Sequence, residues 1–130
     1  MKEFLLKTLI AIGAALAPIK MVMITVGFLI LADLITGIWA AHKRGEKISS
    51  AVMRRTISKM FAYQMSVVGW FLLETYILGG SIPVSKIVAG VIGMVEFKSV
   101  LENSNVIVGD DVFAMILKKL GSENHKYKKE

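Results

Sequence analysis

One carboxylate lies deep inside an otherwise uncharged stretch of the chain. The 21 residues from Met21 to Ala41 contain a single ionisable side chain, Asp33. A charge at the centre of a membrane-length helix costs ~2.5 to 3.5 kcal/mol, so we expect Asp33 to be paired, protonated or in contact with water. Lys59 and Lys98 are the cations available to pair with it. The alternative is a polar contact that only holds two helices together.

A second series of polar residues lies near the end of a later apolar segment. Three- and four-residue steps separate its members, which are Glu96, Ser99, Glu102 and Asn103. Such spacing places side chains on one face of a helix. The alternative is that these residues mark the solvated end of that helix.

Small residues recur at one-turn spacing in two apolar segments. Gly37 and Ala41 form one such pair, directly after Thr36, and Ala89 and Gly93 form another. Small residues four apart let two helices approach closely inside a membrane. The same spacing also arises often by chance.

The composition favours a membrane protein and disfavours an enzyme. The 130 residues are 55% hydrophobic, which is too apolar for a soluble domain of this size. The two histidines are isolated, and the sequence has no cysteine, phosphate-binding glycine loop or metal-ligand spacing. We therefore expect no catalytic, cofactor or metal site. The net charge of +6 comes from residues flanking apolar segments, so a membrane surface is the expected acidic partner rather than nucleic acid.

The apolar segments predict an all-α integral membrane protein with three transmembrane helices. About 20 apolar residues cross the ~30 Å hydrocarbon core of a bilayer. The first span is residues 21–41, with Gly45 beyond it as a typical helix stop. The second covers 60–78. The third, 82–101, has lysines near both ends that can reach toward water, and a helix lying on the membrane surface is its alternative.

Three regions follow from this division of the chain. Residues 1–20 predict an amphipathic or partly inserted helix, too short to span and broken from the next one at Pro18. Residues 21–109 form the transmembrane domain. Residues 110–130 form a basic tail.

The distribution of charge predicts the orientation. Six Lys or Arg residues lie between His42 and Lys59, whereas residues 75–85 carry no charge. Loops rich in Lys and Arg remain cytoplasmic, so the first loop is expected on that side. Three spans then place the C-terminal tail in the cytoplasm as well. The N-terminus lies outside unless residues 1–20 add a fourth pass.

Two motifs resemble those of a bacteriophage holin family, the small toxin-secretion and phage-lysis holins. The first is D-x-x-T-G-x-x-A-A, which begins at Asp33 and ends at Ala41 and is followed by Ser49-Ser50. The second is E-x-x-S-x-x-E-N, from Glu96 to Asn103. The resemblance covers roughly residues 31–109. The chain departs from it at Gly109-Asp110-Asp111, where such proteins often continue with a glycine-proline turn.

The resemblance implies a multi-pass protein of the host bacterial cytoplasmic membrane. Such a protein forms homo-oligomers, opens lesions in the bilayer and so releases or activates a cell-wall-degrading endolysin. Helices with small-residue faces can associate side by side, and a sparse polar stripe can face water once enough subunits assemble. That stripe would consist of Asp33, Thr36, Glu96 and Ser99.

Two other classes remain as alternatives. One is a membrane anchor or scaffold that recruits partners through its basic loop and tail. A small channel subunit without lytic activity is the other. A holin collapses the membrane potential abruptly, whereas a scaffold leaves it intact.

Overall fold

The protein is built from helices joined by short turns. The computed structural model describes the backbone of residues 1–126 and the side chains of residues 1–121, so Lys126, Lys128 and Lys129 of the expected basic tail have side chains outside the described part. The helices are α1 (Lys2–Leu16), α2 (Lys20–Lys43), α3 (Ser50–Tyr76), α4 (Val84–Val108) and α5 (Val112–Lys126), with a 3-10 turn, η1 (Ala17–Ile19), between the first two. The described residues form no strand, which confirms the all-α prediction.

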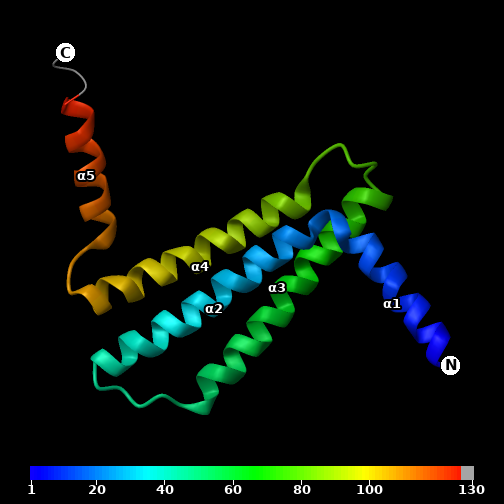
Figure 1. Cartoon of the computed structure of the whole chain (residues 1–130), viewed down its shortest axis with the longest axis horizontal. Helices are drawn as coiled ribbons and strands as arrows, with labels where there is room; N and C mark the ends of the chain where they lie inside the picture. The colour runs from blue at the N-terminus through cyan, green and yellow to red at the C-terminus, as the bar shows by residue number, and fades with distance from the viewer. Residues whose placement is uncertain (127–130) are drawn as a thin grey trace.

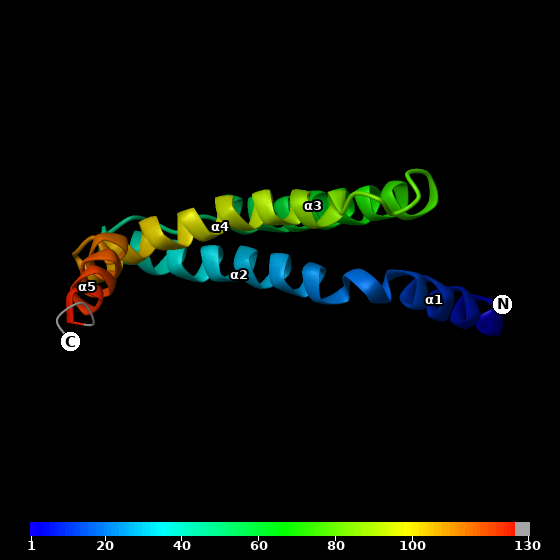
Figure 2. The same ribbon diagram turned by 90° about the horizontal axis from the view of Figure 1, so that it is seen from above.

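Three long helices lie side by side and form a bundle. Helices α2 and α4 run parallel to each other, and α3 runs antiparallel to both (Figure 1). Helix α2 packs most extensively on α4, and α3 contacts both. The end of α2, the start of α3 and the end of α4 therefore lie at one end of the bundle, and α5 begins there (Figures 1 and 2).

The interior of the bundle contains few apolar side chains. The buried apolar residues form one cluster contributed by η1, α2, α3 and α4: Ile19, Val26, Ile30, Val67, Phe71 and Ala89. Many large apolar side chains lie instead on the outer surface. An outer surface of this kind is normal where lipid, not water, is the solvent, because lipid tails are as apolar as the side chains.

Two of the helices, α2 and α4, end at a glycine with a positive φ. Gly45 adopts a φ of 73°, and the Glu46 amide donates to the Ala41 carbonyl at 3.0 Å, which is the Schellman arrangement that ends a helix. The helix α2 therefore stops where the sequence predicts. Gly109 ends α4 with a φ of 83°.

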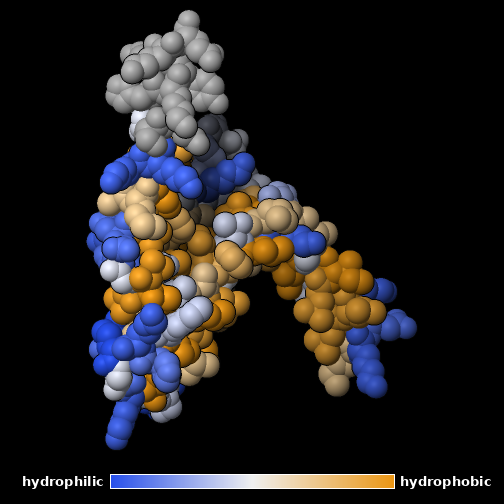
Figure 3. All heavy atoms as spheres, turned by 60° about the vertical axis from the view of Figure 1, so that its left-hand side comes forward, coloured by the Kyte–Doolittle hydropathy of each residue, from blue (hydrophilic) through white to orange (hydrophobic). Residues whose placement is uncertain are grey.

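The N-terminal helix projects away from the bundle. Pro18 lies in the 3-10 turn between α1 and α2, and α1 leaves the bundle at an angle from there (Figure 1). None of its residues is buried. Its surface is mostly hydrophobic, with hydrophilic atoms gathered near the tip (Figure 3). The predicted break at Pro18 is thus a bend and not a loop.

One helical stretch in the described part of the chain has the length and composition needed to cross a membrane. It comprises residues 2–43, which include α1, η1 and α2. Helices α3 and α4 are also long, at 27 and 25 residues, but neither contains a segment of membrane-spanning length that is as apolar and as poor in charge. The prediction of three spans therefore remains a prediction.

Two elements differ from the sequence-based expectation. Helix α4 begins at Val84 and continues to Val108, beyond the expected end at residue 101. The expected basic tail contains a helix, α5, whose first turn is capped by Asp111 because its Oδ1 accepts the Ala114 amide at 3.0 Å. The charge pattern of residues 110–130 gave no sign of this helix, since local capping and not charge starts it.

Candidate functional site: an ionic cluster between three helices

Each long helix contributes one ionisable residue to a cluster inside the bundle. Asp33 comes from α2, Lys59 from α3 and Glu96 from α4. The Lys59 Nζ lies 2.9 Å from Asp33 Oδ2 and 2.6 Å from Glu96 Oε2. One ammonium thus pairs with two carboxylates. We call these three residues the ionic cluster.

The side chains of the ionic cluster are largely buried. The Glu96 side chain is 2% exposed, that of Asp33 18% and that of Lys59 24%. Among the described residues, Glu96 Oε2 has no hydrogen-bond donor besides the Lys59 ammonium. A buried carboxylate without its cation is strongly unfavourable, so Lys59 is the residue that lets both acids remain inside.

An amide and a hydroxyl extend the cluster toward the end of the bundle. The Asn103 Nδ2 in α4 lies 3.3 Å from Asp33 Oδ1 and 3.3 Å from Thr36 Oγ1. The Thr36 hydroxyl in turn donates to the Ala32 carbonyl of its own helix at 2.8 Å. Asp33 therefore receives a hydrogen bond on one oxygen and an ion pair on the other.

Small residues bring α2 and α4 close enough for these contacts. A Cβ added at Gly37 would lie 3.5 Å from Asn103 Nδ2, and one at Gly93 would lie 3.3 Å from Leu29 Cδ1. Ala89 is buried in the apolar cluster. In this structure, the small residues therefore face a neighbouring helix of the same chain.

A cavity of about 340 Å³ adjoins the ionic cluster. Its lining includes charged, polar and apolar groups, among them Asp33, Gly37, Arg55, Lys59, Ser99 and Asn103. A cavity with this many polar groups suits water. In the described part of the chain, no group of three or more His, Cys, Asp or Glu residues could hold a metal ion.

Three of the predicted site residues lie away from the ionic cluster. Lys98 and Glu102 form a pair at 3.5 Å with side chains 78% and 64% exposed. Ala41 lines a smaller cavity of about 100 Å³ with residues of the α2–α3 loop. Lys59 and not Lys98 is therefore the cation that contacts Asp33. The other predicted residues lie in or beside the cluster, with Ser99 on the cavity wall.

Sequence comparison assigns the chain to a family. The family model described as the bacteriophage holin family matches residues 10–122, most of the chain. The chain belongs to the bacteriophage holin family. This match confirms the resemblance to a holin family, and it implies location in the bacterial inner membrane. No curated protein and no solved structure matches this holin-family chain.

Polar contacts that the sequence analysis missed also link the helices of this holin-family chain. Gln64 of α3 donates through Nε2 to the Met23 carbonyl of α2 at 2.8 Å, and its buried Oε1 has no partner among the described residues. Glu74 of α3 accepts the Ser85 amide at the start of α4 at 2.8 Å. Gln64 is the only amide side chain in residues 60–78, and a polar side chain inside an apolar segment needs a partner there just as Asp33 does.

A hydrogen bond links the start of the basic loop to the end of α4. The Lys43 Nζ donates to the Ile107 carbonyl in the last turn of α4 at 2.8 Å. Arg44 and Glu46 pair at 2.7 Å, and the hydrogen bond from Arg44 lowers the pKa of the Glu46 carboxyl. The Lys43 contact satisfies a carbonyl at a helix end that has no partner within the helix.

Proposed function

We propose that this chain is a holin that oligomerises in the bacterial inner membrane and permeabilises it, so that an endolysin reaches the cell wall. Membership of the holin family supports this function. The observation that carries the proposal further is the ionic cluster, because charges buried between membrane helices mark functional sites. The proposed partners are the bilayer, further copies of the chain and an endolysin.

The proposal includes three membrane spans, namely α2, α3 and α4. With 24, 27 and 25 residues, these helices are ~36 to 40 Å long at 1.5 Å per residue, enough for a ~30 Å hydrocarbon core. Pairing within the ionic cluster lowers the cost of placing its charges in a membrane. The basic loop and α5 would face the cytoplasm, as the charge asymmetry predicts.

The ionic cluster suggests how a closed subunit could become part of a lesion. Lys59 alone joins α3 to the carboxylates of α2 and α4. Displacement of α3 would expose those carboxylates, the Asn103 amide and the adjoining cavity. Such groups are stable only against water, so they would line a wet surface shared by several subunits. The strength of the cluster would therefore set the onset of permeabilisation.

Expression in a bacterium tests this proposal. The wild-type chain should collapse the membrane potential abruptly and release a cytoplasmic reporter protein. Asp33→Asn leaves Lys59 paired with Glu96, so this variant should insert and accumulate normally but change the onset of collapse. Glu102→Gln removes an exposed carboxylate from a surface pair and is the matched control, with unchanged onset.

Each alternative function predicts a different result in this expression experiment. An intact potential after wild-type expression would contradict the holin function and favour an anchor or scaffold. Collapse of the potential without release of the reporter protein would favour a small channel subunit. Wild-type onset in Asp33→Asn would show that the ionic cluster does not control permeabilisation.

A further inference from the structure

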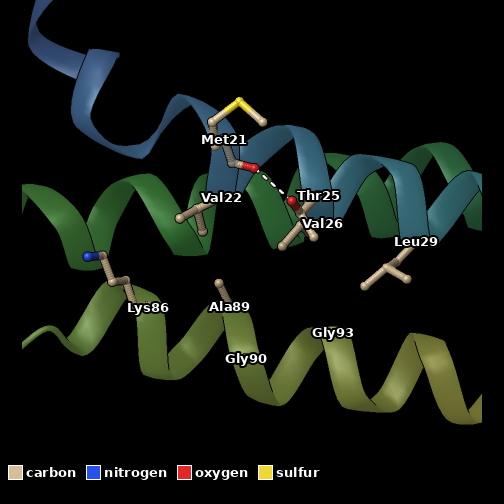
Figure 4. Close-up of a pocket in the computed structure, with 9 residues that line it drawn as sticks. All are labelled: Met21, Val22, Thr25, Val26, Leu29, Lys86, Ala89, Gly90 and Gly93. Carbon is tan, nitrogen blue, oxygen red and sulfur yellow. Dashed lines mark hydrogen bonds between the residues drawn. The ribbon is translucent and has the colours of Figure 1, made fainter.

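A groove runs between α2 and α4 at the end of the bundle where both helices begin. Its volume is about 440 Å³. Valine and leucine side chains of α2 point toward α4, and Ala89 points back toward α2, while Gly90 and Gly93 leave room between them (Figure 4). The groove narrows where the position of a Gly93 Cβ lies 3.3 Å from Leu29. It is thus an apolar groove along two parallel helices that narrows at Gly93.

The groove is lined by one hydroxyl group, and that group is not free to donate a hydrogen bond to a ligand. Thr25 donates that hydroxyl hydrogen to the Met21 carbonyl of its own helix at 2.8 Å (Figure 4). A polar ligand would lose its hydrogen bonds to water on entering such a groove without replacing them. A hydrocarbon chain loses nothing of this kind, so the lining fits an acyl chain.

The opening of the groove carries positive charge. Lys86, the third residue of α4, lines this opening (Figure 4). The start of α4 adds the positive end of a helix dipole. Glu74 offsets part of this charge through its contact with the Ser85 amide. Lys86 is therefore the cation that the opening of the groove offers.

We propose that this groove binds an anionic phospholipid, with the phosphate at Lys86 and an acyl chain along α2 and α4. The combination of a cation at the mouth and an apolar groove behind it matches the two parts of such a lipid. A helix of a second copy is the alternative occupant, since α3 already packs against both α2 and α4, and the labelling experiment distinguishes the two. In the proposed orientation the bound lipid belongs to the outer leaflet.

Photo-crosslinking of the purified full chain tests the site without reference to permeabilisation. The probes are phosphatidylglycerol and phosphatidylcholine with the same diazirine-bearing acyl chain, each a minor component of phosphatidylcholine vesicles. Peptide mass spectrometry should find labels in residues 21–29 and 86–93, and more of them with the anionic probe. Lys86→Gln should reduce that preference about fivefold, which corresponds to ~1 kcal/mol for one basic residue at a membrane surface. Lys47→Gln, in the loop at the opposite end, should leave it unchanged.

A second pair of variants tests whether the lipid occupies the groove itself. A Cβ at Gly90 meets no atom within 4 Å, so Gly90→Leu adds a side chain without disturbing the helix packing and should abolish labelling of the groove. Gly69→Leu on α3 is equally unobstructed and should preserve labelling. Equal labelling by both probes, labels spread evenly over all helices, or labelling that survives Gly90→Leu would each overturn the proposal. Absence of lipid label from residues 21–29 and 86–93 would also overturn it and would favour a second copy in the groove, even if the protein permeabilises cells.

Discussion

The unequal roles of the charged residues are clearest at Lys59. Its ammonium pairs with Asp33 and Glu96, so the loss of either acid still leaves an ion pair. The loss of Lys59 leaves two carboxylates facing each other in the interior. Breaking a buried pair by removing one partner costs far more than the pair contributes relative to an apolar substitute. Lys59 is therefore the residue on which the stability of the ionic cluster depends.

Lys59→Met should destabilise the folded bundle by about 3 to 5 kcal/mol, because two buried acids lose their cation. Unfolding of the purified protein in mixed micelles with increasing dodecyl sulfate measures this change. Lys98→Met, which removes an exposed cation, should cost ~1 kcal/mol or less.

Removal of both acids should restore stability to the Lys59→Met protein. Adding Asp33→Asn and Glu96→Gln to Lys59→Met removes both uncompensated acids, and most of the lost stability should return. Equal unfolding of the Lys59→Met and Lys98→Met proteins would show that the cluster contributes no more than a surface pair.

Close packing of α2 on α4 is the main contact between elements. The sequence predicts that Gly37 and Ala41, and Ala89 and Gly93, allow close approach of two helices. In the structure, Gly37 faces Asn103 and Gly93 faces Leu29, both within one chain. Substitutions at these glycines would thus act first on the fold of the subunit, and any effect on oligomers would follow from that.

Gly93→Leu should destabilise the bundle by about 1 to 3 kcal/mol, because its Cβ lies 3.3 Å from Leu29 Cδ1 and the branched side chain forces α2 and α4 apart. The same micelle unfolding assay measures the loss. Gly69→Leu, where no atom lies within 4 Å of the added Cβ, should stay within ~0.5 kcal/mol of wild type. Similar losses in both proteins would mean that glycine itself, and not the α2–α4 contact, is responsible.

The whole molecule has two different ends. The basic loop, the end of α4 and the start of α5 lie at one end, and the contact between Lys43 and Ile107 joins them there. The uncharged turn between α3 and α4 lies at the other end, near α1 (Figures 1 and 2). Loops rich in Lys and Arg remain in the cytoplasm, so such a molecule should insert in one orientation, with its basic loop on the cytoplasmic side.

Single cysteines at Ser49 and Ser81 should therefore react from opposite faces of the inner membrane, with Ser49 reachable only from the cytoplasm. The chain has no cysteine of its own, so each variant carries one reactive thiol. Labelling of intact and permeabilised cells with a membrane-impermeant maleimide measures the two accessibilities. Reaction of both cysteines from the same face would rule out the three-span topology.

Much of the fold could be predicted from the sequence because its causes are local. Apolar length, Gly45 and the basic residues after α2 define where that helix begins and ends. The helix α5 was missed because its start depends on the Asp111 cap and on contacts at the end of α4, which a reading of net charge does not detect.

The sequence by itself determined that Asp33 must be paired, protonated or in contact with water, since an isolated charge in an apolar helix is unfavourable in any packing. It also determined which residues share a helical face, because the period of the helix is fixed. Only the tertiary structure decided that the partner is Lys59 and that Glu96 joins it. The reason is that helical period says nothing of which faces meet, and the small residues between α2 and α4 set that contact through packing.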